Sequence, residues 1–171
     1  MLVWTDDCDM VSEDETLVHQ IYQRVNSIWE SKLVDPTYML GIRREVTHTC
    51  GGEMEVELTM TAFVDAMAAA FQEHLKKRTI STPLPDGFFI HKDKNTPEEE
   101  IKAVLSRGYQ RLFGMRLWAA RGTFPECLEG TSMLGRVMAA PTEQAWDAAC
   151  HMLTYMQFVI QVVAISSQWH T

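Results

Sequence analysis

The sequence predicts an α+β protein in which a small part with strands comes first and an all-helical part follows. Residues 1–5 are apolar and β-prone, and residues 53–60 alternate strictly between apolar and polar side chains, as in a half-buried strand. Beyond Pro97, apolar residues recur at helical spacing. Because 46% of the 171 residues are hydrophobic, the chain is long enough to bury the core of one domain or of two small lobes.

The N-terminal residues predict a β-hairpin followed by a helix. Residues 1–5 form the first strand, Asp6-Asp7 makes the turn, and residues 8–11 return. Ser12 and Glu15 have the spacing of a capping box, which starts a helix that runs to about Ser31. The apolar residues of this helix are expected to bury one face. They are Leu17, Val18, Ile21, Val25, Ile28 and Trp29.

Two further strands and a second helix complete the first part. Residues 38–46 predict a strand with Gly41 inside it, and the strand at 53–60 precedes a helix at 61–77. Proline residues and an Asp-Gly turn then predict a loop. The expected domain organisation is residues 1–78, a linker loop at 79–97, and a helical region at 98–171.

The helical region is expected to contain four helices. They are predicted to start near residue 98 and to lie at 109–120, at 126–139 and from 142 onward. The apolar stretch at 155–165 predicts a buried helix or a sticky chain end. It does not reach the ~18 residues of a membrane span, and the N-terminus lacks a signal-peptide pattern. We therefore expect an intracellular protein, cytoplasmic or nuclear, with no membrane partner.

Charge is distributed unevenly along this chain, whose net charge is −8. Residues 1–60 hold 12 acidic and 4 basic residues, whereas residues 102–121 contain no acid at all. Such a basic segment either contacts phosphates or carries ordinary solvated helix charges. Its basic residues are Lys102, Arg107, Arg111, Arg116 and Arg121. The four cysteines form no CxxC pair, which argues against a zinc ribbon and against a dense disulfide framework.

Asp6 and Asp7 are the first candidate site. Neighbouring carboxylates repel each other unless a turn or a cation uses them, and Asp is depleted in strands. The pair therefore indicates either a solvated hairpin turn or half of a metal site.

Six short segments follow one another in a distinctive order between residues 2 and 156. Residues 2–7 read Leu-Val-Trp-Thr-Asp-Asp, residues 80–87 read Ile-Ser-Thr-Pro-Leu-Pro-Asp-Gly, and residues 109–114 read Tyr-Gln-Arg-Leu-Phe-Gly. The others are residues 35–42, 123–126 and 136–156. Together they resemble the copia-type retrotransposon reverse transcriptases, whose Tyr-x-Asp-Asp, Thr-Pro-Leu-Pro-x-Gly and Tyr-Arg-x-Leu-Val-Gly motifs occur in this order.

The resemblance implies the end of a polymerase palm, built of antiparallel hairpins with packed helices, followed by a helical thumb and connection region. The implied reaction is RNA-directed DNA synthesis, in which two Mg²⁺ ions stabilise the attacking and leaving oxygens. By resemblance, Asp6 is the main Mg²⁺ ligand, Asp7 supports it, and Trp4 packs near the primer terminus. The basic residues between Lys102 and Arg121 would follow the phosphates of the RNA or DNA template–primer.

The implied metal site is incomplete within this chain. The family uses a third carboxylate on a strand upstream of the hairpin, together with a fingers domain, and the chain begins five residues before Asp6. We therefore expect a polymerase fragment that is inactive alone. One alternative is a non-enzymatic interaction module whose helical half binds a partner helix through Met-rich surfaces, with self-association through an exposed strand edge. Another is a decayed gene fragment, since Met60, Gln110 and Phe124 depart from the family pattern.

Overall fold

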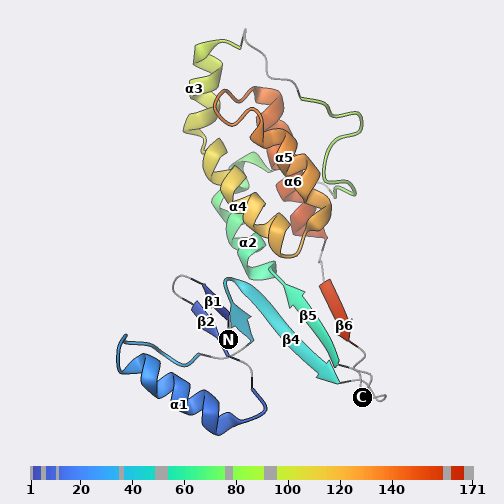
Figure 1. Ribbon diagram of the computed structural model, residues 1–171. Helices are drawn as coiled ribbons and strands as arrows, with labels where there is room; N and C mark the ends of the chain where they lie inside the picture. Colours follow the sequence, from blue (N-terminus) through green and yellow to red (C-terminus); the bar gives the residue numbers. More distant parts are fainter. Residues whose placement is uncertain are drawn as a thin grey trace. The chain divides into compact units, whose positions relative to one another are not determined.

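A computed structural model describes residues 2–4, 7–10, 12–34, 37–48, 54–75, 79–90, 96–159 and 163–167. The fold is mixed α+β, which confirms the predicted class at that level. The chain forms two compact units, Met1–Leu58 with Ala164–Thr171 and the intervening residues 59–163. Figure 1 shows the strands of the first unit and the helices of the second.

The first unit begins with the predicted hairpin. Strands β1 (Leu2–Trp4) and β2 (Asp7–Asp9) pair antiparallel, with Trp4 opposite Asp7. The hairpin is therefore confirmed, but Asp7 belongs to the returning strand and not to the turn. Asp6 lies outside the described residues.

Helix α1 (Glu15–Asn26) is capped by Asp14, so the predicted cap at Ser12 was wrong. The Asp14 carboxylate accepts hydrogen bonds from the backbone N–H groups of Thr16 and Leu17, at 2.8 and 3.3 Å. An aspartate satisfies two of the free N–H groups of the first turn and its charge suits the positive end of the helix dipole. The Ser12 hydroxyl instead accepts a hydrogen bond from the backbone N–H of Asp14, at 3.1 Å.

The predicted burial of the apolar face of this helix was also wrong. No residue of α1 is buried, Leu17 is 45% exposed, and Trp29 just beyond the helix is 68% exposed. The apolar spacing specifies a face that favours burial, but burial also requires a neighbouring element. On this face Val18, Ile21 and Val25 are half-buried and no residue is fully buried.

The main sheet of the first unit has the strand order β3-β4-β5-β6. Its strands are β3 (Tyr38–Met39), β4 (Ile42–His48), β5 (Met54–Thr59) and β6 (Val163–Ser167). The single strand predicted at 38–46 is two antiparallel strands, because Leu40 and Gly41 both have positive φ angles, 55° and 78°, and form a two-residue turn. The apolar stretch at 155–165 was predicted to be a buried helix or a sticky chain end, and it is neither. Its first residues belong to α6 and its last residues belong to β6.

The second unit is a helical core. Its elements are α2 (Thr61–Ala70), η1 (Gln72–His74), α3 (Glu98–Ser106), α4 (Tyr109–Gly122), η2 (Pro125–Cys127), α5 (Leu128–Gly135) and α6 (Glu143–Phe158). Helix α6 packs against α2, α3 and α4, and α4 also packs against α5. The predicted start of α6 is confirmed, because the Thr142 side chain caps it by accepting a hydrogen bond from the N–H of Ala145 at 3.2 Å.

Helix α2 belongs to this helical unit. It packs against α6 through Val64 and Met67, which are buried in the core. The two compact units therefore divide at Leu58, ahead of the loop at 79–97 where the sequence placed the boundary. The reason is that the apolar face of α2 is buried among other helices of the second unit.

Candidate functional site

The β1–β2 hairpin carries the predicted metal ligands. Asp7 is the first residue of β2 and pairs with Trp4, the last residue of β1. Residues 5 and 6 separate the two strands in the sequence, and Asp6 lies outside the described residues. Antiparallel pairing on both sides fixes where the chain enters and leaves this connection.

The donor chemistry of this connection fits a hard divalent cation. Two adjacent carboxylates provide oxygen ligands of the kind that Mg²⁺ prefers, and Mg²⁺ keeps several waters, so a few protein ligands suffice. Within the described ranges, no group of three or more His, Cys, Asp or Glu side chains is arranged to hold a metal ion. Asp6 and Asp7 remain the candidate ligands.

Two of the five predicted phosphate-binding residues are held in ion pairs. The Lys102 ammonium lies 2.7 Å from the Glu98 carboxylate, four residues earlier on α3. The Arg107 guanidinium donates two hydrogen bonds to Glu143, at 2.7 and 2.6 Å, and lies over the Trp146 ring at 5.9 Å. These bonds raise the pKa of Arg107 and lower the pKa of Glu143. Arg107 thus joins the end of α3 to the start of α6.

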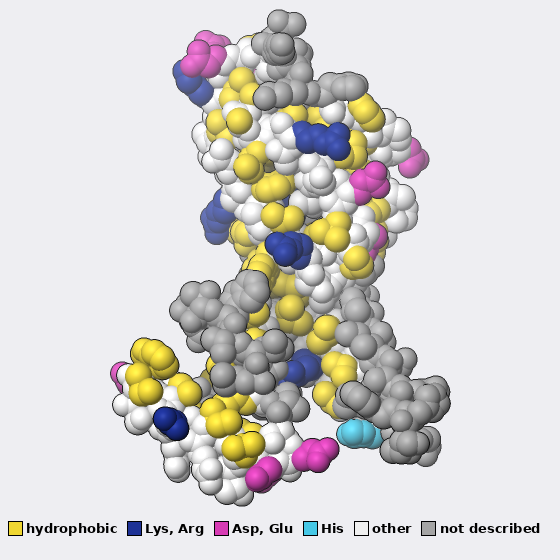
Figure 2. All heavy atoms as spheres, viewed as in Figure 1, with side chains coloured by type: hydrophobic (Ala, Val, Ile, Leu, Met, Phe, Trp, Pro, Cys, Tyr) yellow, Lys and Arg dark blue, Asp and Glu magenta, His cyan; other side chains and the backbone are white. Residues whose placement is uncertain are grey.

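Arg111 and Arg121 lie exposed on α4. The Arg111 guanidinium is placed over the Phe71 ring, 5.8 Å from its centroid. Arg121 is in the last turn of α4, and its side chain forms no ion pair or hydrogen bond with the described part of the chain. In Figure 2 the Lys and Arg side chains of the helical unit, drawn in dark blue, form separate patches and not one continuous strip.

Arg116 is buried, so its predicted role in contacting phosphates was wrong. Its side chain is 0% exposed, because it shares the core face of α4 with Tyr109, Leu112 and Ala119. One guanidinium nitrogen, Nη1, contacts Met152 Sδ at 3.5 Å, while Nε and Nη2 have no partner within the described residues. Burial lowers the pKa of Arg116 to about 10, which still leaves the group charged at neutral pH.

The surroundings of Arg116 provide no negative charge. Burial raises the pKa of Tyr109 and of Cys127 to about 12, so both groups stay neutral at pH 7. The Tyr109 hydroxyl donates its hydrogen bond to the Leu134 carbonyl, at 2.9 Å. The helical unit therefore holds a charged guanidinium in its core with no paired carboxylate among the described residues.

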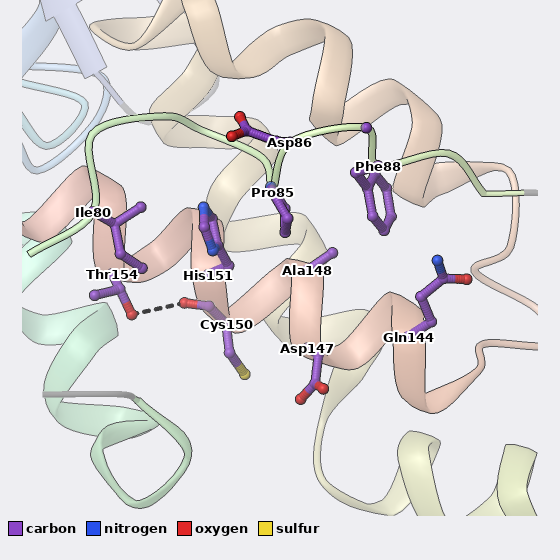
Figure 3. A pocket seen from close by; sticks show the side chains of 11 residues that line it. Ile80, Pro85, Asp86, Phe88, Gln144, Asp147, Ala148, Cys150, His151 and Thr154 are labelled. Carbon is purple, nitrogen blue, oxygen red and sulfur yellow. Dashed lines mark hydrogen bonds between the residues drawn. The ribbon is translucent and has the colours of Figure 1, made fainter. Parts of the chain in front are cut away.

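A cavity of about 450 Å³, which no sequence pattern indicated, lies between the loop at 79–90 and α6. Two side chains of α6 fix the loop: His151 Nε2 lies 3.0 Å from the Thr82 carbonyl, and the Gln144 amide donates to the Phe89 carbonyl at 3.5 Å. In Figure 3, Pro85 and His151 point into the space between loop and helix. Its lining combines apolar side chains with Asp86, Asp147, Cys150 and His151.

No helix among the described residues combines the length and the apolar character that crossing a membrane requires. Comparison with protein families, curated proteins and solved structures found no match.

Proposed function

We propose that this chain is part of a copia-type reverse transcriptase, an RNA-directed DNA polymerase, and comprises the end of its palm and its thumb and connection region. The observation that carries the proposal is the pairing of Trp4 with Asp7 across β1 and β2. The Tyr-x-Asp-Asp resemblance requires two acids at a bend between paired strands, and this pairing leaves only residues 5 and 6 to make the bend.

Asp6 and Asp7 are the proposed Mg²⁺ ligands. When bound in such polymerases, Mg²⁺ stabilises the charge that develops on the reacting phosphate oxygens. The role of this chain is to hold the two carboxylates on a backbone that the strand pairing fixes. Because the resemblance identifies only two of three carboxylates in these 171 residues, we expect cation binding but no primer extension by this chain alone.

A titration of the purified chain with Mn²⁺ or Mg²⁺, followed by calorimetry, tests the proposal. Asp6→Asn and Asp7→Asn should each weaken binding at least about tenfold, which corresponds to roughly 1.4 kcal/mol. Asp9→Asn is the matched control, since Asp9 lies in β2 opposite Leu2, away from the connection. Binding that is the same in the parent chain and in both test variants would contradict the proposal.

A second candidate function is that of an interaction module, and one observation favours it. Large apolar side chains are exposed on α1 and in the segment after it. They are Leu17, Ile28, Trp29, Leu33 and Val34. Single apolar residues are ordinary on a surface, whereas several exposed within one segment favour a protein–protein contact. Self-association that is insensitive to divalent cations, and that Trp29→Ser abolishes, would favour this function over the polymerase.

A further inference from the structure

One side of α4 combines exposed cations with an exposed aromatic ring. Arg111, Gly114, Trp118 and Arg121 follow one another at intervals of three, four and three residues, which places them on one side of a helix. We call these four residues the α4 face. Both arginines are exposed and Trp118 is 37% exposed. At Gly114 an added Cβ would meet nothing within 4 Å, so the backbone is open to close approach.

The charges of this face are available to a ligand. Helix α4 contains no acidic residue, and Arg121 has no ion pair within the described residues. The Arg111 guanidinium lies over the Phe71 ring, 5.8 Å from its centroid, and forms no ion pair within the described residues. Lys102 and Arg107 differ in this respect, because Glu98 and Glu143 neutralise them. The α4 face therefore fits a polyanion that also offers flat rings.

We propose that the α4 face binds single-stranded nucleic acid, with phosphates at Arg111 and Arg121 and a base against Trp118. The ten-residue interval between the arginines spans about 15 Å along the helix, which leaves room for more than one nucleotide between the two phosphates. Single-strand sites combine cationic and aromatic side chains in this way, and a base paired inside a duplex has both of its flat sides covered by its neighbours.

This inference rests on the proposed function and deepens it. In a polymerase, the bound single strand would be the unpaired part of the template. Of the five basic residues that the sequence predicted to contact phosphates, the proposed site keeps Arg111 and Arg121. It also includes Trp118. The structure places it partly in solvent, between the two arginines along the helix.

Fluorescence anisotropy of the full chain with a labelled oligothymidine of about 12 nucleotides, over a series of salt concentrations, tests the inference. The single strand should bind more tightly than a blunt duplex of the same length. Trp118→Ala should weaken binding about tenfold, whereas Trp118→Phe should keep most of it. The Arg111→Ala, Arg121→Ala double variant should reduce the slope of log affinity against log salt by about 1.4.

Lys102→Ala is the matched control, because Lys102 is exposed and basic but paired with Glu98, and its binding should equal that of the parent chain. Unchanged oligothymidine binding in Trp118→Ala and in the double arginine variant would overturn the inference, as would a preference for the duplex. Mn²⁺ binding by the α4 variants should stay intact. The α4 substitutions could leave oligothymidine binding unchanged while Asp6→Asn still weakens Mn²⁺ binding. In that case the α4 inference fails and the proposed polymerase ancestry stands.

Discussion

Arg116 has the least favourable surroundings of any charged side chain among the described residues. It is fully buried, two of its nitrogens lack partners there, and its pKa of about 10 keeps it charged at neutral pH. A buried charge without a partner costs several kcal/mol, and an apolar side chain of similar size avoids that cost. Arg116 therefore lowers the stability of the helical unit.

We predict that Arg116→Met raises the free energy of unfolding by about 1–3 kcal/mol. Urea denaturation followed by far-UV circular dichroism measures the change. Arg111→Met serves as the control, since Arg111 is exposed, and it should change stability by no more than about 0.5 kcal/mol. A loss of more than about 1 kcal/mol in Arg116→Met would show that the guanidinium stabilises the core.

The Arg107–Glu143 ion pair makes a pH-dependent contribution to the free energy of unfolding. Its hydrogen bonds lower the pKa of Glu143, so the stabilisation is present above the ordinary value of 4.5 and is lost as the pH falls through the lower folded value. Both side chains are substantially exposed, which limits the contribution to about 0.5 kcal/mol. We predict that Glu143→Gln destabilises the protein at pH 7 by this amount and that the effect becomes smaller as the pH falls to 3.

Thermal unfolding at the two pH values measures this difference. Glu143→Gln keeps the backbone N–H of residue 143, which donates to the Glu100 carboxylate at 2.9 Å, so the substitution isolates the side-chain pair. A stability difference between parent and variant that is the same at pH 7 and pH 3 would contradict the assignment.

The burial of Arg116 shows what the sequence interpretation missed. A run of basic residues suggested a surface, but position 116 lies at helical spacing from Tyr109, Leu112 and Ala119, all of which are buried. The spacing of apolar neighbours predicts the core face of a helix better than the charge of one residue does. The same spacing relates Val64, Met67 and Phe71, which are buried in and just after α2.

At the scale of elements, helix positions in the second unit were predictable and strand details were not. Pro97, Pro141 and the helical spacing indicated where α3 and α6 begin to within a few residues. The turn between β3 and β4 was missed because Leu40 adopts a positive φ angle, which a leucine rarely does. The connection between paired strands was foreseen, since apolar residues on both sides of Asp6-Asp7 predict a hairpin.

Helix α1 depends on its N-cap, because no residue of it is buried. We predict that Asp14→Ala destabilises this helix by about 1 kcal/mol, since two N–H groups of the first turn lose their acceptor. Amide hydrogen exchange at residues 16 to 20 should become faster. Glu13→Ala is the control, because Glu13 precedes the cap, and unchanged exchange in Asp14→Ala would contradict this assignment.

At the scale of the whole molecule, the core is confined to the second unit. Every buried apolar residue among those described lies between Met60 and Met156. Local opening costs least where few apolar contacts are broken. We predict that α4 and α6 show the slowest hydrogen exchange in the chain and that α1 exchanges much faster, as measured by mass spectrometry. Equal protection of α1 and α6 would show that α1 has a stable partner.

The division into two units also separates the two proposed activities. The proposed cation site is in the β1–β2 hairpin of the first unit, and the proposed strand-binding site is on α4 in the second. Substitutions in one unit should therefore leave the other activity intact, so the two activities can be tested one at a time on the full chain.

The most direct test is a crystal of the full chain soaked in Mn²⁺ and measured at the manganese absorption edge. The proposed function predicts an anomalous peak within coordination distance, about 2.0–2.3 Å, of carboxylate oxygens of Asp6 or Asp7, and no such peak in Asp6→Asn. A fully ordered β1–β2 connection that binds no Mn²⁺ would contradict the claim that this hairpin derives from a polymerase palm.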